Sequence, residues 1–421
     1  MVRLIATIYI VLVITQPSEW IRLFEGLPVQ ELALVAGLGF SALLKGDRLS
    51  EVLFSSPSKF FILFIILSIL SVLANGDSLS YAFGTIAYKY IKFYIGYLII
   101  VVANDEPEKI RKTFFWTIMS GLVVSYLCIR LMLTGEGVGA GIGVTEQTLN
   151  WRGSVQWLGA FGGGNTTGLL LLFIFAISLG CVFKESSKIR QLFYISTSAY
   201  IGFAFLLTHS RGGFLGLLAV LGYFVFIHIK MSFKKFLPLA VVIGIIVLVL
   251  KPEEEGRGLK ESSTPERVEL FHQGLQMFKH NPFFGVGSSR FKNNNRIKKT
   301  AHNIYLNTLA ETGFPGLFVF ISMWFFVFKK ILDNVKSIDV KSLINRNIQT
   351  SFLLISGIGV SLFFLSADHE LPYMAFAFLT ASANQFKSEY HITVSEYKNI
   401  FKLIVFIIFC VYIAIQLYFM I

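Results

Sequence analysis

Charged residues are scarce in this chain. Only 15% of its 421 residues are Asp, Glu, Lys or Arg, whereas 54% are hydrophobic. A soluble globular domain carries about a quarter charged residues, so this composition excludes a soluble protein. Long apolar runs recur along the sequence, and about 20 apolar residues are enough for a helix to cross a bilayer. The sequence therefore predicts an all-α, polytopic membrane protein.

Cysteine is also rare, and its positions exclude two kinds of chemistry. Cys128, Cys181 and Cys410 lie inside apolar runs with neither metal-ligand spacing nor an evident partner, so we interpret them as buried thiols. No group of His, Cys, Asp or Glu has zinc spacing, and no aspartate pair indicates a divalent-metal site. We therefore expect no metal and no cofactor. The net charge of +12 comes without a nucleic-acid motif, so it predicts membrane and phosphate partners and no nucleic acid.

Apolar runs of spanning or near-spanning length predict about 12–13 transmembrane helices. These runs cover residues 3–15, 28–44, 59–74, 81–103, 113–133, 165–183, 191–208, 213–229, 236–250, 304–328, 347–366, 371–386 and 401–420. The first and the twelfth are short for a full crossing. We divide the chain into nine transmembrane helices over residues 1–250, one large loop over 251–303, and C-terminal transmembrane helices over 304–421.

Lys and Arg gather in every second loop, which predicts the orientation. Lys109–Lys112 and Lys329–Arg346 are examples, and the intervening short loops carry almost no basic residues. Because cytoplasmic loops carry the excess of Lys and Arg, we place the N-terminus inside and residues 251–303 outside. The outer loop nevertheless contains a dense basic stretch, Arg290–Lys299. Those charges either hold an anion or reflect the translocation of long loops regardless of charge, and the pattern alone leaves both explanations open.

The outer loop also carries the signals of an amphipathic helix. Thr264–Pro265 is a typical helix start, and Asn281–Pro282 is a typical stop. Apolar residues at helical spacing define one face between them: Val268, Phe271, Leu275 and Phe278. We expect this helix to lie on the membrane surface or against the bundle. Gly285 and Gly287 then predict a tight turn.

Two arginines in this pattern are candidates for binding an anion. Arg211 begins a spanning helix in the segment THSRGGFLGLL, where a charge is costly unless it faces a partner or a cavity. The helix start adds partial positive charge, so we interpret Arg211 as a phosphate or diphosphate clamp rather than a snorkelling arginine. Arg267 adds a guanidinium to the first turn of the outer helix. The alternative for Arg267 is a solvated surface charge.

His302 is the candidate base. It lies at the predicted membrane boundary, just before a helix, and histidine can accept a proton near neutral pH. A boundary histidine is otherwise more often structural. Further candidates for substrate contact come from the basic stretch, the next helix start and other outer loops. They are Arg290, Asn303, Arg152 with its neighbours Trp151 and Trp157, and the acidic pair Asp368 and Glu370, which we more readily interpret as loop residues.

Three motifs together resemble the O-antigen ligase and polymerase family. They are SRGG at a helix start, HNPFFGVG after the outer helix, and HNIYLNTLAETGFPG from His302 onward; the similarity spans about residues 160–330. The resemblance implies a bacterial inner-membrane glycosyltransferase whose active site faces the periplasm. It implies that Arg211 and Arg267 bind the diphosphate of an undecaprenyl-linked glycan, that His302 is the base, and that transfer inverts the anomeric centre without metal or nucleotide.

The acceptor distinguishes two activities within this resemblance. A ligase transfers the glycan to lipid A–core oligosaccharide, whereas a polymerase uses a second lipid-linked glycan. Both need the same donor chemistry, so the motifs do not separate them, and we favour the ligase. A transporter is a more distant alternative, which predicts ionisable residues at mid-membrane and paired broken helices. The only such candidates, Lys89, Lys92 and Arg130, are placed near predicted membrane boundaries.

Overall fold

The computed structural model describes residues 1–138, 154–183, 185–229, 263–334, 342–365, 369–386 and 395–402, with 404, 405 and 408. Within these ranges the chain forms helices and no strand. Six helical stretches are long and apolar enough to span a membrane. They are Val2–Glu19 (α1, Val2–Thr15, and η1, Pro17–Glu19), Ser56–Ala74 (α4), Leu79–Ala103 (α5, Leu79–Tyr81; η3, Ala82–Ala87; α6, Tyr88–Ala103), Pro107–Thr134 (α7), Gly164–Val182 (α8) and Ile304–Asn334 (α14). The protein is therefore an all-α, multi-pass membrane protein, as predicted.

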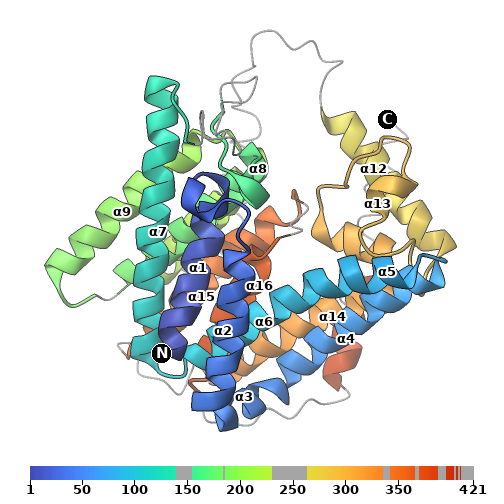
Figure 1. Ribbon diagram of the computed structural model, residues 1–421, viewed down its shortest axis with the longest axis horizontal. Coiled ribbons are helices and arrows are strands. Elements are labelled where there is room, and N and C mark those ends of the chain that lie inside the picture. Colours follow the sequence, from blue (N-terminus) through green and yellow to red (C-terminus); the bar gives the residue numbers. More distant parts are fainter. Residues whose placement is uncertain are drawn as a thin grey trace.

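Further helices complete the bundle and the segment of residues 263–303, which we call the outer segment (Figure 1). They are α9 (Lys188–Leu206), α10 (Arg211–Ile229), α12 (Ser263–His280), α13 (Phe291–Asn294), α15 (Leu343–Ser361), α16 (Leu371–Ala383), and the short turns η2 (Arg22–Phe24) and η4 (Gly159–Phe161). The predicted span at 28–44 is only the first half of a bent pair. There, α2 (Val29–Leu44) meets α3 (Gly46–Leu53) at 111°. The predicted span 236–250 and most of 401–420 fall on residues that the structure does not describe.

The loops predicted to be cytoplasmic meet at one end of the bundle, which we call the basic-loop end. Lys45 Nζ, at the bend between α2 and α3, lies 2.5 Å from Asp105 Oδ2 in the loop between α6 and α7. Arg346, in the first turn of α15, pairs with Glu185 in the loop after α8. Four loops that are far apart in the sequence thus share one end, in agreement with the alternation of basic residues.

The helix ends that adjoin the loops with few basic residues meet at the opposite end of the bundle. Ser210 Oγ, before α10, donates to Asn165 Oδ1 at the start of α8 over 3.1 Å. The N–H of Ile304, at the start of α14, donates to the carbonyl of Leu362 just after α15 over 3.0 Å. Helices α12 and α13 pack on α14 at this end and lie above α14 on the right as drawn (Figure 1).

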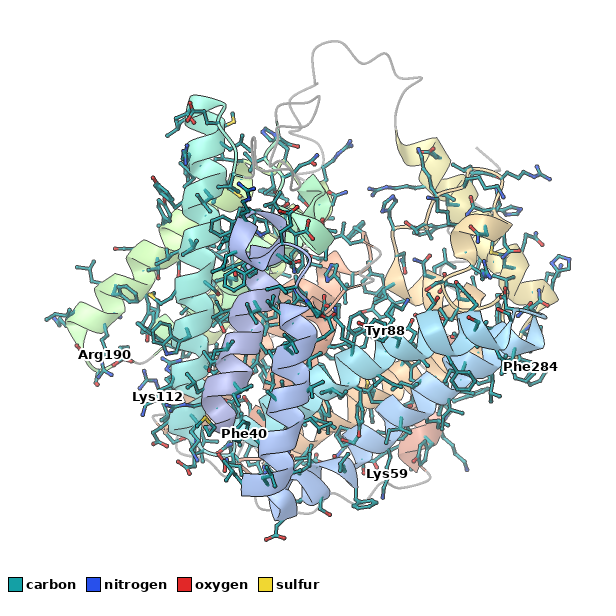
Figure 2. The ribbon with its side chains drawn as sticks, in the orientation of Figure 1. Phe40, Lys59, Tyr88, Lys112, Arg190 and Phe284 are labelled. Atoms are coloured by element: carbon teal, nitrogen blue, oxygen red, sulfur yellow. The ribbon has the colours of Figure 1, made fainter. Side chains whose placement is uncertain are left out.

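Large apolar side chains are exposed along the sides of the bundle. Leu43 on α2 is 81% exposed and Ile189 on α9 is 83% exposed. Phe40 on α2 is another exposed example (Figure 2). Such a surface is unfavourable in water and favourable in hydrocarbon, so it fits a helical bundle surrounded by lipid.

Helix α12 ends at His280, immediately before the predicted stop at Asn281–Pro282. Its buried face differs from the predicted one. Leu270 and Met277 are buried against α13 and α14, whereas the predicted Phe271 and Leu275 are only partly buried. The reason is Gly274, where a Cβ atom would come 3.0 Å from both Leu306 and Phe291, so the helix approaches α14 most closely at this glycine. Helix α12 therefore lies against the bundle.

Candidate functional site

The backbone on both sides of His302 is held by α14. Asn303 caps this helix, since its Oδ1 accepts the N–H of Leu306 over 2.9 Å. Asn307 Oδ1 accepts the N–H of Ala301 over 3.2 Å. His302 itself has a φ of +51°, in the left-handed region, which costs energy for a residue other than glycine. These two hydrogen bonds stabilise that backbone and so fix where the imidazole lies.

The preceding turn is fastened to the same helix. The carboxylate of Glu311 accepts the N–H of Ser289 over 2.8 Å and that of Phe291 over 3.1 Å. Gly285 has a φ of +65°, and a Cβ there would overlap the backbone of Glu311. Gly313, at a kink inside α14, has a φ of +70°, and a Cβ there would lie 2.5 Å from a carbonyl oxygen of this turn. Asn307 and Glu311, one turn apart on α14, therefore hold the preceding chain, and Asn303 caps the start of the same helix.

Arg211 begins α10. Ser210 Oγ accepts the N–H of Gly213 over 3.1 Å, which caps the helix start. A Cβ at Gly212 would lie 2.7 Å from Phe364 Cβ, so this glycine lets α10 approach the chain just after α15. The Arg211 side chain is exposed, at a helix end that carries partial positive charge.

Arg211 lies close enough to Arg267, and Arg267 close enough to His302, for the charge of the first residue to affect the pKa of the second. Burial lowers the pKa of Arg267, and the charge of Arg211 lowers it further. Burial likewise lowers the pKa of His302, followed by the charges of Arg267 and Lys299, while Glu266 opposes them. Lys299 Nζ lies 2.6 Å from Glu266 Oε1. The structure thus brings together three residues that the sequence analysis selected from three separate segments.

Neither arginine of this cluster forms a salt bridge with another described residue. The two guanidinium groups repel each other, and the Glu266 carboxylate only partly offsets the effect on Arg267. A bound anion would offset the remaining repulsion. The arrangement can therefore bind a phosphate-like group beside a neutral imidazole.

Arg290 and Asn303 have structural partners. The Arg290 Nε donates to Asp77 Oδ2 over 3.2 Å, and the guanidinium carbon lies 4.0 Å from the centre of the Tyr81 ring. These contacts tie the outer segment to the loop before α5. Because the Asn303 side chain is buried and occupied as a cap, we leave both residues out of the proposed site.

Other candidate contacts are also buried or fall outside the described residues. Trp157, a candidate for substrate contact, is 2% exposed and its Nε1 donates to the carbonyl of Ile14 over 3.1 Å, so its side chain is buried in the bundle. Glu370 is buried and lies 3.1 Å from Lys92 Nζ. The remaining three candidates, Trp151, Arg152 and Asp368, are not among the residues that the structure describes.

An apolar groove begins next to the cluster, and the sequence analysis missed it. Its volume is about 510 Å³, and it runs between α14 and α15. At one end the rings of Tyr305, one turn after His302, and Phe363 lie 4.5 Å apart; at the other the rings of Phe328 and Phe352 lie 5.6 Å apart. Apolar residues are so common here that no sequence pattern marks this groove. Lys299 belongs to the predicted basic stretch, but the sequence did not indicate that it pairs with Glu266 beside His302.

Residues 196–321 match the family described as O-Antigen ligase. The match supports assignment to the O-antigen ligase and polymerase family. It confirms the resemblance, and the matched range contains Arg211, Arg267 and His302. This O-antigen ligase-like segment contains α10, α12, α13 and the start of α14. No curated protein matches the chain.

Proposed function

We propose that this protein is an O-antigen ligase. It transfers a glycan from undecaprenyl diphosphate to a lipid A–core acceptor at the periplasmic face of the bacterial inner membrane. The observation that carries the proposal is the meeting of Arg211, Arg267 and His302 at the end of the bundle opposite the basic loops. A polymerase, with a second lipid-linked glycan as acceptor, would use the same donor site. The ligase is favoured by the description of the matching family.

The arginines bind the diphosphate. Each guanidinium offers a planar fork of N–H donors that fits phosphate oxygens. As the bond between the anomeric carbon and the diphosphate breaks, negative charge develops on the leaving oxygen. Fixed positive charge at that position stabilises the transition state more than the ground state. Arg211 and Arg267 supply this charge from helix starts that are already held in place.

His302 acts on the acceptor. Its lowered pKa keeps the imidazole neutral near pH 7 and able to accept a proton. The acceptor hydroxyl gives its proton to His302 while its oxygen attacks the anomeric carbon. The bond to the diphosphate breaks on the opposite side of the sugar, so the anomeric centre is inverted. The products are the glycosylated acceptor, undecaprenyl diphosphate and protonated His302, which then releases its proton to water.

The apolar groove accommodates the isoprenoid chain of the donor. It is lined by aromatic and branched side chains of α14 and α15 and starts within one turn of His302. A chain lying in it would place its diphosphate at the arginines. The transfer needs no metal in this proposal, because the arginines provide the positive charge. No group of three His, Cys, Asp or Glu that could hold a metal ion occurs in the described part of the chain.

Deletion of the gene, followed by electrophoresis of the surface polysaccharide, tests the proposal. Loss of a ligase leaves long glycan chains unattached to lipid A–core, and complementation with His302→Ala does not restore attachment. Single repeats joined to the acceptor would instead identify a polymerase. An unchanged polysaccharide would refute both activities.

A further inference from the structure

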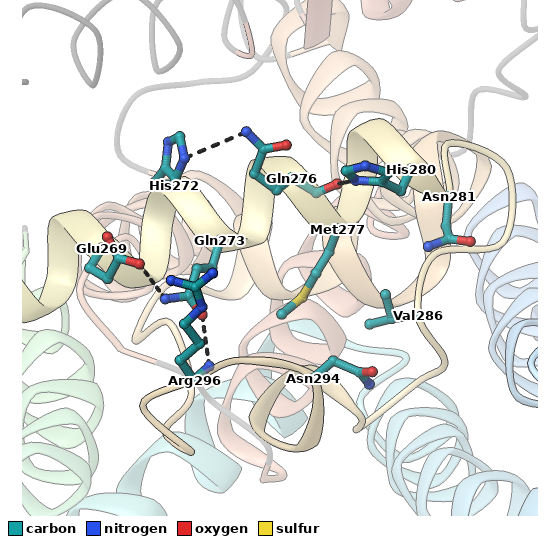
Figure 3. Close-up of a pocket in the computed structure, with 10 residues that line it drawn as sticks. All are labelled: Glu269, His272, Gln273, Gln276, Met277, His280, Asn281, Val286, Asn294 and Arg296. Carbon is teal, nitrogen blue, oxygen red and sulfur yellow. Dashed lines mark hydrogen bonds between the residues drawn. The ribbon is translucent and has the colours of Figure 1, made fainter.

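A second cavity lies on the outer segment, and neither Arg211 nor Arg267 lines it. Its volume is about 700 Å³, and it lies between α12 and the chain from Val286 to Arg296 (Figure 3). Its polar lining includes Glu269, Gln273, Gln276, His280, Asn294 and Arg296. Met277 and Val286 add an apolar floor. The volume falls within the range of about 300–1,000 Å³ that is usual for ligand sites.

The lining chemistry fits a carbohydrate. Side-chain amides and imidazoles can both donate and accept hydrogen bonds, as sugar hydroxyls do. One carboxylate, Glu269, and one guanidinium, Arg296, leave the cavity nearly uncharged, so it does not suit a diphosphate. The apolar floor matches the C–H face of a sugar ring. A lipid chain would require a more apolar lining, such as that of the groove beside α15.

The walls of the cavity are joined to each other. Gln273 donates from Nε2 to Glu269 on the same helix, and its Oε1 accepts the N–H of Arg296 from the facing segment over 2.8 Å. His280 and Gln276 are linked one turn further on, where His280 Nδ1 lies 2.7 Å from the Gln276 carbonyl oxygen. The cavity is therefore formed without a ligand, which reduces the cost of binding one.

We propose that this cavity binds sugars of the donor glycan that lie beyond the sugar joined to the diphosphate. The inference rests on the proposed function, because it takes the diphosphate to be bound at Arg267. Gln276 follows Arg267 by nine residues on the same helix, which is about 13.5 Å along the helix axis and about half a turn around it. A glycan that leaves the arginines must therefore cross over α12 as well as follow it, and it reaches the cavity after its first sugars. Donors whose glycan contains several repeat units then bind more tightly than donors whose glycan contains one repeat unit.

The test compares two native lipid-linked donors, one carrying a single repeat and one carrying several, with full-length protein in liposomes. Gln276→Ala removes an amide from the lining, and Gln276→Trp fills the cavity. Both should lower kcat/KM for the long donor about tenfold more than for the short donor, the effect of losing one or two hydrogen bonds. Lys279→Ala is the matched control, since this exposed residue lies on the same helix but does not line the cavity.

The possible results separate the two proposals. If Gln276→Ala and Gln276→Trp leave the ratio of kcat/KM between the long and the short donor unchanged, the cavity is not a glycan site. This holds whether both variants are fully active or lose equal activity with both donors. If the wild-type protein transfers neither donor, the proposed function itself fails.

Discussion

Arg267 lies close enough to His302 for its positive charge to add to the effect of burial, and both lower the pKa of the imidazole. These residues belong to different elements, since Arg267 is in the first turn of α12 and His302 lies in the loop before α14. Arg211, at the start of α10, in turn lowers the pKa of Arg267. One anion bound at the two arginines would therefore also change the proton affinity of the imidazole. This coupling connects donor binding to the availability of the base.

The fork geometry of Arg211 can be tested by substitution. Arg211→Ala should abolish transfer, and Arg211→Lys should remain about 10- to 100-fold below wild type, because lysine keeps the charge but loses paired N–H donors. The measurement is the rate of glycan transfer in liposomes. A lysine variant as active as wild type would show that charge alone suffices at this position.

Donor binding should depend on Arg267. Arg267→Ala should raise the KM for the lipid-linked donor, by about tenfold for one lost charge-assisted contact, while membrane insertion stays normal. Steady-state kinetics over a range of donor concentrations measure this effect. A variant with the same KM and kcat as the wild type would show that Arg267 is a solvated surface charge that does not bind the donor.

Activity should depend on pH through His302. The neutral imidazole is the active form, so the rate is full above its pKa and falls as the pH drops through it. Since burial and the charges of Arg267 and Lys299 lower this pKa, the midpoint should lie below the usual histidine value of about 6.5. Lys299→Gln removes one of those charges, so the midpoint should move to higher pH. Lys298→Gln is the matched control, and an identical shift in both variants would contradict the local effect.

Metal independence follows from the use of arginines as the positive charge. Purified protein in excess chelator should keep its transfer rate. A requirement for magnesium or manganese would contradict the proposed chemistry and would direct attention to the acidic side chains of the outer loops, Asp368 and Glu370 among them.

The turn that carries HNPFFGVG should be sensitive at Gly285. Gly285→Ala combines a left-handed φ of +65° with overlap against α14, so we expect a loss of about 1–3 kcal/mol in stability. Gly46→Ala is the control, because a Cβ there meets open space and its φ is not positive. Thermal unfolding of the two purified variants in detergent provides the comparison. Equal midpoints would show that this glycine is not required by the turn.

Local chemistry explains what the sequence could predict. The end of α12 before Asn281–Pro282 and the turn at Gly285 could be predicted from the backbone preferences of those residues. Arg211, Arg267 and His302 could be selected because charged and titratable residues are rare in a membrane protein, and because their motifs resemble a known family.

Other features depended on contacts between distant segments. The buried face of α12 is set by how closely Gly274 lets α14 approach, which periodicity does not reveal. Trp157 belongs to a loop by sequence, yet it is buried against the end of α1. In these cases packing between distant segments decides which side chains are buried, and the local sequence does not.

The most direct test is transfer by the purified protein and by His302→Ala, in liposomes that contain lipid-linked donor and lipid A–core acceptor. The wild type should release undecaprenyl diphosphate in step with glycosylation of the acceptor. The variant should bind donor normally but transfer about 10²- to 10⁴-fold more slowly, the usual contribution of a positioned base. A variant that keeps more than about a tenth of the wild-type rate would contradict His302 as the base.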